Sequence, residues 1–387
     1  MSGPPGVLLD RGALDAVIAL LRADGYRTVG PVVRSGVVGL GDLASTADMP
    51  EGVADEAEPG HYRLRDTGDL RLFAWAVGPQ SWKREFFPPR LTLWRAHTGG
   101  DVSVQEERDE APPLAVIGAR PCDLAALAVL DGVLASGAHP DPSYRDRRRA
   151  SFVVAVECVV PGGTCFCASM GTGPAATGGF DLCLIELDDD DGPRYLVRAG
   201  SARGEEVLAR IDPAAAAEEG DWDARAQALA DATAAMGRTL DTNGLPALLA
   251  RNQDHPRWAE VASRCLACGN CTTVCPTCFC SSVEDTTDIT GEVRRDRRWS
   301  SCFELDHSYL HGGPVRASTS SRYRQWITHK LSTWQDQFGT SGCVGCGRCL
   351  TWCPVGIDIT VEAAAIRADD RGLDTAPAGA GTAEVTT

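Results

Sequence analysis

The first half of the chain alternates between two patterns of hydrophobic positions. Residues 12–24 carry apolar side chains at helical spacing, and these are Leu14, Val17, Ile18 and Leu21. Because positions three and four apart share one face of a helix, this stretch predicts an amphipathic helix. Short apolar runs predict strands, and they lie at 71–77, 114–118, 151–156 and 182–187.

One of these strands is followed directly by a turn and a helical pattern. After residues 114–118 the chain reads ARPCDLAALAVLD, in which Pro121 and Asp123 mark the start of a helix. A strand, a turn and a helix in this order are typical of a sheet with parallel strands. Residues 1–210 are therefore expected to form an α/β domain with a mixed, partly parallel sheet.

The pattern changes after residue 210. Residues 211–256 are rich in alanine and acidic side chains, which predicts a helical linker with a connecting stretch around 243–255. Residues 257–367 hold most of the cysteines, and we expect them to form a mainly helical, ferredoxin-like domain. The last segment, 368–387, is small and polar and contains Gly and Pro, so it predicts a disordered tail.

Composition and charge narrow the possible functions. A chain of 387 residues is long enough for one large or two ordinary domains. Its net charge of −16 argues against a nucleic-acid or anionic-membrane surface, because phosphate binding needs clustered Lys and Arg. The first residues do not resemble a signal peptide, and no uncharged run is long enough to cross a bilayer. The 16 cysteines then indicate metal binding more than disulfides, so we expect a cytoplasmic protein.

Two cysteine motifs near the C-terminus share the spacing C-x2-C-x2-C-x3-C-P. They are CLACGNCTTVCP at 265–276 and CVGCGRCLTWCP at 343–354. This is the ligand run of bacterial two-cluster ferredoxins, in which the fourth cysteine of each motif binds the other cluster. A zinc ribbon has no use for third and fourth cysteines at this spacing. We therefore predict two [4Fe–4S] clusters, one on Cys265, Cys268, Cys271 and Cys353 and the other on Cys343, Cys346, Cys349 and Cys275.

Further cysteines lie around a Pro-Gly-Gly loop that follows a predicted strand, and these are Cys158, Cys165 and Cys167. Cys122 follows another predicted strand, and residues after parallel strands gather at the same edge of a sheet. The pattern predicts a third [4Fe–4S] cluster, with either Cys122 or Asp181 as its fourth ligand. The alternative is a group of buried thiols without metal, which is the expectation for Cys183 within its strand.

A short sequence around these cysteines occurs twice. The hexapeptide TCFCAS at 164–169 nearly repeats as TCFCSS at 277–282, directly after the first ferredoxin motif. Cys278 and Cys280 are therefore expected to lie beside a cluster and to influence its potential rather than to bind it. The pattern assigns no role to Cys302.

Motifs for other cofactors and for catalysis are missing from the sequence. No G-x-G-x-x-G follows a strand, so no flavin or nicotinamide site is predicted. No pair of carboxylates and no nucleophile with its base stands out, and we expect no catalytic residue. A chain that carries electrons but has no site where they are used needs a redox partner at each end. The motifs thus indicate a subunit of a larger redox complex.

Several stretches together resemble a known family. They are VGPQSWKREFFPP at 77–89, ARPCDLAALAVLD at 119–131, CVVPGGTCFCASMGTGP at 158–174, GFDL at 179–182 and CPTCFC at 275–280. From about residue 10 to residue 367, the chain is similar to the iron–sulfur β subunit of soluble, sulfhydrogenase-type [NiFe] hydrogenases. The same family includes the A subunit of anaerobic sulfite reductase.

The resemblance implies partners that the motifs alone do not name. In that family the β subunit lies between a flavin- and NAD(P)-binding γ subunit and the small subunit, which leads to the nickel–iron site of the large subunit. The function it implies is single-electron transfer within a cytosolic, NAD(P)-linked hydrogenase. Two alternatives stay open, which are the A subunit of an anaerobic sulfite reductase and an iron–sulfur sensor or binding module.

Overall fold

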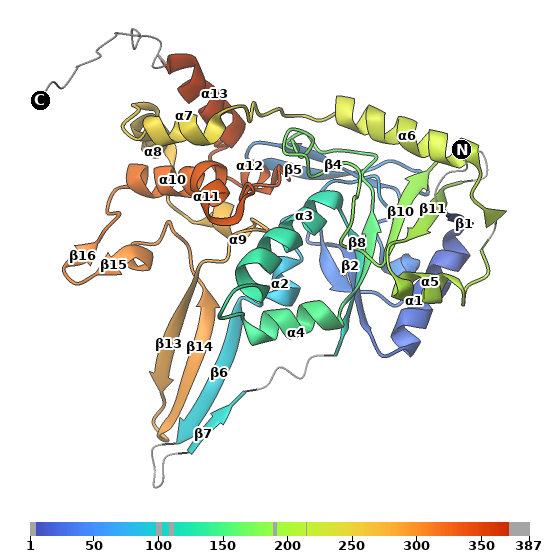
Figure 1. Cartoon of the computed structure of the whole chain (residues 1–387), viewed down its shortest axis with the longest axis horizontal. Coiled ribbons are helices and arrows are strands. Elements are labelled where there is room, and N and C mark those ends of the chain that lie inside the picture. Colours follow the sequence, from blue (N-terminus) through green and yellow to red (C-terminus); the bar gives the residue numbers. More distant parts are fainter. Residues whose placement is uncertain (1–4, 98–102, 108–111, 189–191, 214, 371–387) are drawn as a thin grey trace, which may run out of the picture.

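A computed structural model describes residues 5–97, 103–107, 112–188, 192–213 and 215–370 (Figure 1). Its largest element is an eight-stranded sheet in the order β12-β1-β11-β10-β9-β8-β2-β3. The strands are β1 (Val7–Leu9), β2 (Arg27–Arg34), β3 (Val37–Asp42), β8 (Leu114–Ala119), β9 (Phe152–Val156), β10 (Leu182–Leu187), β11 (Arg194–Ala199) and β12 (Ala215–Ala216). The pairs among β2, β8, β9 and β10 are parallel and the others antiparallel, so the predicted mixed sheet is confirmed.

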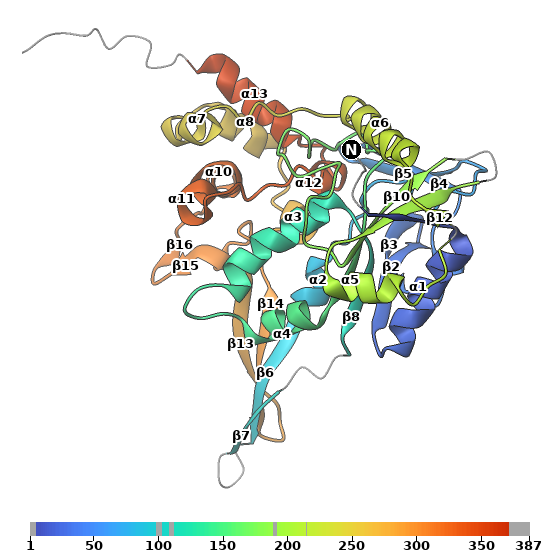
Figure 2. The same cartoon turned by 45° about the vertical axis from the view of Figure 1, so that its right-hand side comes forward.

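Helices cover both faces of this sheet (Figure 2). One face packs against α1 (Arg11–Ala23) and α5 (Ala202–Leu208). The other face packs against α3 (Pro121–Leu130), α4 (Pro142–Ala150) and α6 (Glu219–Ala234). Because both faces are covered, β8, β9 and β10 are buried along their whole length and read as apolar runs. Helix α1 corresponds to the amphipathic helix predicted in residues 12–24, and α3 corresponds to the helix predicted to start at Pro121 and Asp123.

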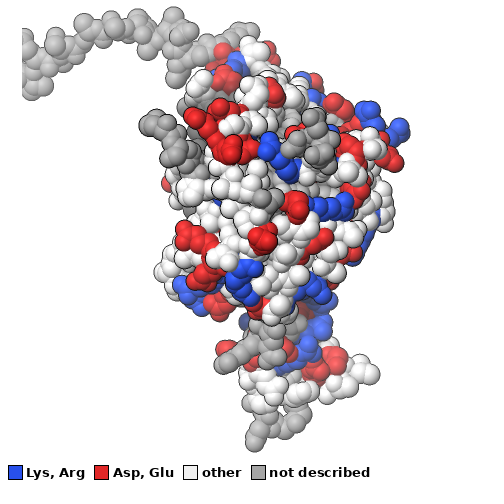
Figure 3. All heavy atoms as spheres, turned by 90° about the vertical axis from the view of Figure 1, so that its right-hand side faces the viewer, with Lys and Arg blue, Asp and Glu red and all other residues white. Residues whose placement is uncertain are grey.

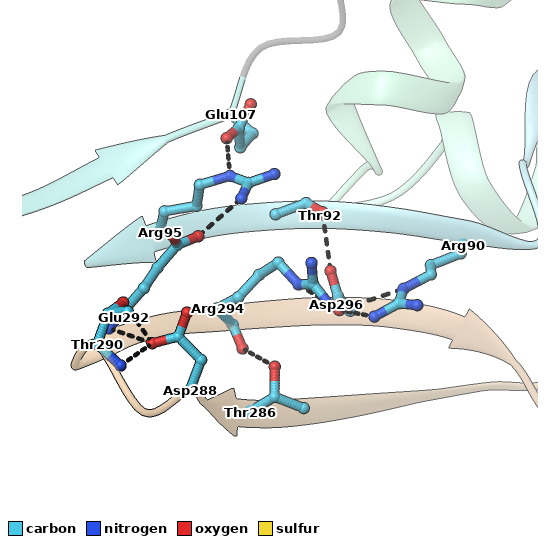
Figure 4. Close-up of polar contacts among 10 residues, drawn as sticks. All are labelled: Arg90, Thr92, Arg95, Glu107, Thr286, Asp288, Thr290, Glu292, Arg294 and Asp296. Atoms are coloured by element: carbon cyan, nitrogen blue, oxygen red, sulfur yellow. Dashed lines mark hydrogen bonds and ion pairs between the residues drawn. The ribbon is translucent and has the colours of Figure 1, made fainter. Parts of the chain in front are cut away.

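A second sheet projects from the molecule (Figure 1). Its strands have the order β13-β14-β6-β7, with bounds β13 (Ser281–Thr287), β14 (Glu292–Trp299), β6 (Arg90–His97) and β7 (Ser103–Glu106). Thus two segments about 200 positions apart form one sheet. Its polar face carries a charge network in which the Asp296 carboxylate accepts hydrogen bonds from Arg90, Thr92 and Arg294 (Figure 4).

The segment that carries the ferredoxin motifs contains many short helices. They are α7 (Leu245–Arg251), α8 (Arg257–Arg264), α9 (Asn270–Thr273), α10 (Thr319–Thr328), α11 (Trp334–Phe338), α12 (Arg348–Thr351) and α13 (Ile359–Asp369). The prediction of a mainly helical domain describes this segment only in part, because β13, β14 and the short pair β15 (Tyr309–Leu310) and β16 (Gly313–Pro314) lie between the motifs. Helix α7 also occupies the predicted connecting stretch at 243–255. Of the predicted tail at 368–387, residues 368 and 369 form the end of α13, and residues 371–387 lie outside the described residues.

The strand predicted at 71–77 is wrong, because the chain there is irregular. The Glu186 carboxylate accepts hydrogen bonds from the backbone N–H groups of Leu72 and Phe73, at 2.7 and 3.0 Å. The Arg120 guanidinium donates to the carbonyls of Phe73 and Trp75, at 2.9 and 2.7 Å. Two buried side chains therefore satisfy the backbone groups that a neighbouring strand would otherwise satisfy.

The remaining strand pair, β4 (Val53–Glu58) and β5 (His61–Asp66), forms a separate hairpin. On the face of the molecule that lies to the right in Figure 1, acidic and basic side chains are intermingled (Figure 3). None of the helices within the described ranges is both long and apolar enough to span a bilayer.

Candidate iron–sulfur sites

Three small cavities in the structure are lined by cysteines, five at the first and four at each of the other two. We call them site 1, site 2 and site 3. The predicted ligand sets fall on them as follows: site 1 has Cys265, Cys268, Cys271 and Cys353, site 2 has Cys275, Cys343, Cys346 and Cys349, and site 3 has Cys122, Cys158, Cys165 and Cys167. The fourth cysteine of each ferredoxin motif thus lies at the site of the other motif.

Site 1 lies where α8 ends and α9 begins. Cys265 caps the C-terminus of α8, and Gly269, with φ of +73°, turns the chain into α9, which carries Cys271. The wall includes Tyr323 and Trp326 from α10. The Tyr323 hydroxyl and the Trp326 indole N–H are buried, and neither has a hydrogen-bond partner in the described part of the protein. Such donors fit a cluster whose sulfur atoms accept hydrogen bonds.

Site 2 lies between the two ferredoxin motifs, next to a buried lysine. The Lys330 ammonium donates to the Cys275 sulfur at 3.0 Å. A hydrogen bond from Cys278 and the positive charge of Lys330 hold the pKa of Cys275 well below its ordinary value, although burial alone would raise it. Cys275 is therefore kept in the thiolate form that binds iron.

Site 3 lies at the edge of the large sheet where β8 and β9 end. Cys122 is at the start of α3, Cys158 follows β9, and Cys165 and Cys167 lie on the loop that returns toward β10. Burial is the main cause that raises the pKa of Cys122 and Cys165, with the charges of neighbouring groups adding to it. Iron binding at this site would release the protons of these thiols.

The wall of site 3 also contains the guanidinium of Arg120. This side chain donates to three backbone carbonyls, but its Nε atom is buried without an acceptor in the described residues. An acceptor such as a cluster sulfur would fit there. All three cavities thus offer four thiols, and sites 1 and 3 add unused hydrogen-bond donors.

Asp181, the alternative fourth ligand, does not line site 3. Its carboxylate is buried at the start of β10 and accepts hydrogen bonds from the Val153 N–H at 2.8 Å, the Ser201 hydroxyl at 2.6 Å and Arg203 at 3.0 Å. These bonds connect β9 to the N-terminus of α5. The structure brings Cys122 to the cavity and places Asp181 elsewhere. Cys183 is a buried thiol in the core between β10 and α3.

The three sites lie in a row. Cys349 lines both site 1 and site 2. Phe166, between the site 3 cysteines Cys165 and Cys167, lines site 2, and its backbone N–H donates to the Gly345 carbonyl at 2.8 Å. Gly345 has φ of +64° and allows this close approach, because a Cβ there would lie 2.6 Å from the Phe166 carbonyl oxygen. Site 2 is therefore the middle of the row.

The remaining cysteines of this region, Cys278, Cys280 and Cys302, line none of these cavities. Cys280 lies beside Cys302 and His307, whereas Cys278 lies beside Cys275. Within the described ranges, no three His, Cys, Asp or Glu side chains converge closely enough to bind one metal ion. The four thiolates of a [4Fe–4S] cluster bind four different irons and so stand further apart than ligands of one ion.

Several residues of the sites could not be found from the sequence. Lys330, Arg120, Tyr323 and Trp326 reach the cavities only through the tertiary fold. Arg348 lies between sites 2 and 3 and forms a buried ion pair with Asp123 at 2.9 Å. The sequence positions Arg348 next to the ferredoxin cysteines, but nothing in it indicates the partner, which lies 225 positions away.

Comparisons with known proteins agree with this geometry. Residues 264–357 match the family model of a 4Fe–4S dicluster domain. The chain is also 34% identical over 278 residues to the sulfhydrogenase 2 subunit beta of Pyrococcus furiosus, an alignment that covers 71% of this chain and 79% of that protein. The resemblance noted from the sequence is therefore confirmed, and the chain belongs to the family of iron–sulfur sulfhydrogenase β subunits.

Proposed function

We propose that this chain relays single electrons through three [4Fe–4S] clusters, bound at sites 1, 2 and 3. The observation that supports this most is the row of three adjacent cavities, each lined by the four cysteines of one predicted ligand set. When bound, such clusters supply reversible one-electron chemistry. The chain itself provides the thiolates, fixes the order of the sites and surrounds them with apolar side chains such as Phe166 and Phe303. The Pyrococcus relative is named as a subunit of a sulfhydrogenase.

The proposed partners are a flavin- and NAD(P)-binding subunit at one end of the row and the small subunit of a [NiFe] hydrogenase at the other. The sequence shows no flavin or nicotinamide motif, so we propose that this chain provides only the path for electrons between these partners.

Site 1 is the proposed place where electrons pass to or from one of these partners. Its ligand Cys268 is the exposed cysteine of the chain, whereas the others are buried or half-buried. The apolar side chain of Leu266, which lines the site, is 64% exposed. Exposed apolar side chains near a cluster suit docking of another redox subunit.

A charge at Leu266 tests this docking surface. In the assembled complex, Leu266→Glu is expected to slow electron transfer between this chain and the docked partner at least tenfold, because docking would bury the new carboxylate. Iron content should not change. The matched control is Ile289→Glu, a fully exposed apolar residue at the tip of the β13–β14 hairpin. Equal rates for Leu266→Glu and the wild-type chain would rule out docking at this surface.

Iron analysis and EPR spectroscopy of the anaerobically purified chain test the relay itself. Three clusters require about twelve iron atoms, and the two ferredoxin motifs alone require about eight. Cys122→Ser is expected to change the EPR signal of one cluster only, whereas Asp181→Asn should leave all signals unchanged. Four irons or fewer would contradict the relay, and eight would remove site 3 from it.

Purification from the native host separates the hydrogenase from the alternatives. A nickel protein that co-purifies with this chain supports the hydrogenase, and a sirohaem protein supports the A subunit of a sulfite reductase. A sensor would not be reduced rapidly and reversibly by NAD(P)H in the presence of a flavin subunit. The similarity to a sulfhydrogenase subunit is the observation that favours the hydrogenase.

A further inference from the structure

Lys330 is a fully buried lysine that contacts site 2. It lies on the single π-helical turn His329–Thr333 between α10 and α11, and it is 4% exposed. Its Nζ atom is 3.0 Å from the Cys275 sulfur, 2.9 Å from the Thr277 hydroxyl and 3.4 Å from the Gly342 carbonyl oxygen. An ammonium group has three N–H donors, so this geometry matches a charged lysine with every donor used.

The burial of this charge needs a compensating negative charge. An unpaired ammonium in a protein interior is costly, and buried charges are normally paired. Lys330 forms no ion pair with a carboxylate among the described residues. The negative group that it contacts is the sulfur of Cys275, a predicted ligand of site 2. The lysine is therefore placed to neutralise an anionic group bound at this site.

At neither of the other two sites does a described cation in the cavity wall donate to a predicted ligand sulfur. The wall of site 1 contains no Lys or Arg among the described residues. At site 3, Arg120 directs its hydrogen bonds to the carbonyls of Glu157, Phe73 and Trp75. Arg348, between sites 2 and 3, is neutralised by Asp123. Among the described side chains that line the cavities, Lys330 is the cation that donates to a predicted ligand sulfur and has no carboxylate partner.

We propose that Lys330 raises the reduction potential of the cluster at site 2 and so makes the middle of the row the position where an electron is held. This inference rests on the proposed function. Reduction adds one electron to the cluster and breaks no bond. A positive charge close to the cluster stabilises the reduced form, which carries one more negative charge, and the low dielectric of the interior strengthens this effect. Lys330 is thus a positioning residue, since it acts through Cys275 and the cluster.

The test is an anaerobic redox titration of the purified holoprotein, followed by EPR. The signal of site 2 is identified as the one that Cys346→Ser alters. In Lys330→Met we expect the reduction equilibrium constant of this signal to fall at least tenfold, which equals about 59 mV for a one-electron step. The signals of sites 1 and 3 should shift much less. Lys330→Arg, which keeps the charge, should restore most of the wild-type value.

Lys83 provides a matched control. It is also buried, but it donates to the carbonyls of Thr272 and Thr273, and its ammonium lies 3.9 Å from the centre of the Trp299 ring. Lys83→Met is expected to leave the potential of site 2 closer to the wild-type value than Lys330→Met does. An equal shift in both variants would show a general effect of buried charge and overturn the proposal.

Iron content and circular dichroism establish that each variant is folded and loaded. If Lys330→Met loses iron, Lys330→Gln, which is neutral but keeps an N–H donor, replaces it in the same titration. An unchanged site 2 potential in the loaded neutral variant overturns the role of Lys330 and leaves the relay intact. A wild-type chain without clusters would contradict the proposed function instead, so the two failures can be distinguished.

Discussion

Cys280, like Cys275, has surroundings that favour the negatively charged thiolate, but it lies outside the predicted ligand sets. A hydrogen bond from Cys302 is the main cause that lowers the pKa of Cys280 to about 4, and His307 acts in the same direction, whereas burial opposes it. The pKa of His307 is raised in turn, because it donates to this sulfur. A thiolate is therefore expected at Cys280 at neutral pH, next to but outside the cluster cavities.

The alkylation of Cys280 should accordingly be independent of pH above about pH 6. An ordinary thiol, with a pKa near 8.5, reacts more than about tenfold faster at pH 8.5 than at pH 6, because only the thiolate is nucleophilic. The measurement is the rate of iodoacetamide modification of Cys280 by mass spectrometry under anaerobic conditions. Cys302→Ala removes the hydrogen bond and should restore a rise with pH. A rise of that size in the wild-type chain would contradict the assignment.

At the residue scale, the sequence predicts the site only where ligands are close along the chain. The spacing within CLACGNCTTVCP constrains a turn, so Cys265, Cys268 and Cys271 could be placed together. The choice between Cys122 and Asp181 depended on which side chain faces the cavity, and each lies at the end of a buried strand, Cys122 after β8 and Asp181 before β10. Buried cations such as Lys330 are even less predictable, because a lysine in sequence reads as a surface residue unless its partner is known.

At the element scale, glycines decide whether the loops of sites 2 and 3 can meet. Gly345 and Gly339 have nearly the same positive φ, at +64° and +67°, but their surroundings differ. A Cβ at Gly345 would lie 2.6 Å from the Phe166 carbonyl oxygen and 2.7 Å from the Cys167 backbone nitrogen. A Cβ at Gly339, which caps α11, would have nothing within 4 Å. Replacing each glycine by alanine therefore distinguishes the cost of a left-handed backbone, present at both positions, from the cost of a steric clash, present only at Gly345.

Gly345→Ala is expected to reduce iron at sites 2 and 3, because Phe166 and Cys167 must move away. Gly339→Ala carries only the cost of the left-handed conformation, about 1–2 kcal/mol of stability. The measurements are iron per chain and the EPR signal of each cluster. Equal iron content in both variants would show that the contact between the two loops does not hold the sites.

The projecting sheet depends on charges rather than on an apolar core. Burial would raise the pKa of Asp296, but hydrogen bonds from Arg90 and Thr92 and the charge of Arg294 outweigh it, so its pKa is lowered from the ordinary 3.8 (Figure 4). Because the folded value is the lower one, the carboxylate stabilises the sheet above about pH 4. This stabilisation is lost as the pH falls through the folded pKa.

Asp296→Asn is expected to weaken the sheet at neutral pH by about 1–3 kcal/mol, since several hydrogen bonds to a charged acceptor become neutral. Hydrogen exchange of the β6 and β14 amides at pH 6 should be faster in the variant than in the wild-type chain. After correction for intrinsic rates, the wild-type sheet should lose protection between pH 5 and about pH 3, and the variant should lose less. Identical acid profiles would contradict the role of Asp296.

The elements that the sequence predicts are those whose apolar side chains are buried in the core. β8, β9 and β10 are buried on both faces and were found as apolar runs, and α1 shows helical spacing. β13 and β14 were missed because their sequences, SSVEDTT and EVRRDRRW, are mostly polar; β13 is held by pairing with β14, and β14 also pairs with β6. Residues 71–77 were wrongly predicted as a strand because their apolar side chains are buried, although the segment itself is irregular.

At the scale of the whole molecule, contacts between distant segments connect the predicted domains. β14 pairs with β6, and the Gly60 N–H donates to the Leu350 carbonyl at 3.0 Å. The buried pair of Arg348 and Asp123 joins α12 to the start of α3, with side chains only 3% and 4% exposed. The division into residues 1–210 and 257–367 stays a prediction. These contacts indicate that the two parts unfold together.

Arg348 provides the sharpest measurement of that coupling. Arg348→Met leaves Asp123 buried without its partner and should lower the free energy of unfolding by about 3–5 kcal/mol. Asp123→Asn should be similarly destabilising, and the double variant should lose much less than the sum, because both charges are then gone. Denaturation followed by tryptophan fluorescence and by cluster absorbance should give one coincident transition in the wild-type chain. The control is the exposed pair of Arg298 and Glu284, which should contribute under about 1 kcal/mol. Additive losses in the double variant, or two separate transitions, would show that the sheet domain and the cluster segment are held together by other contacts.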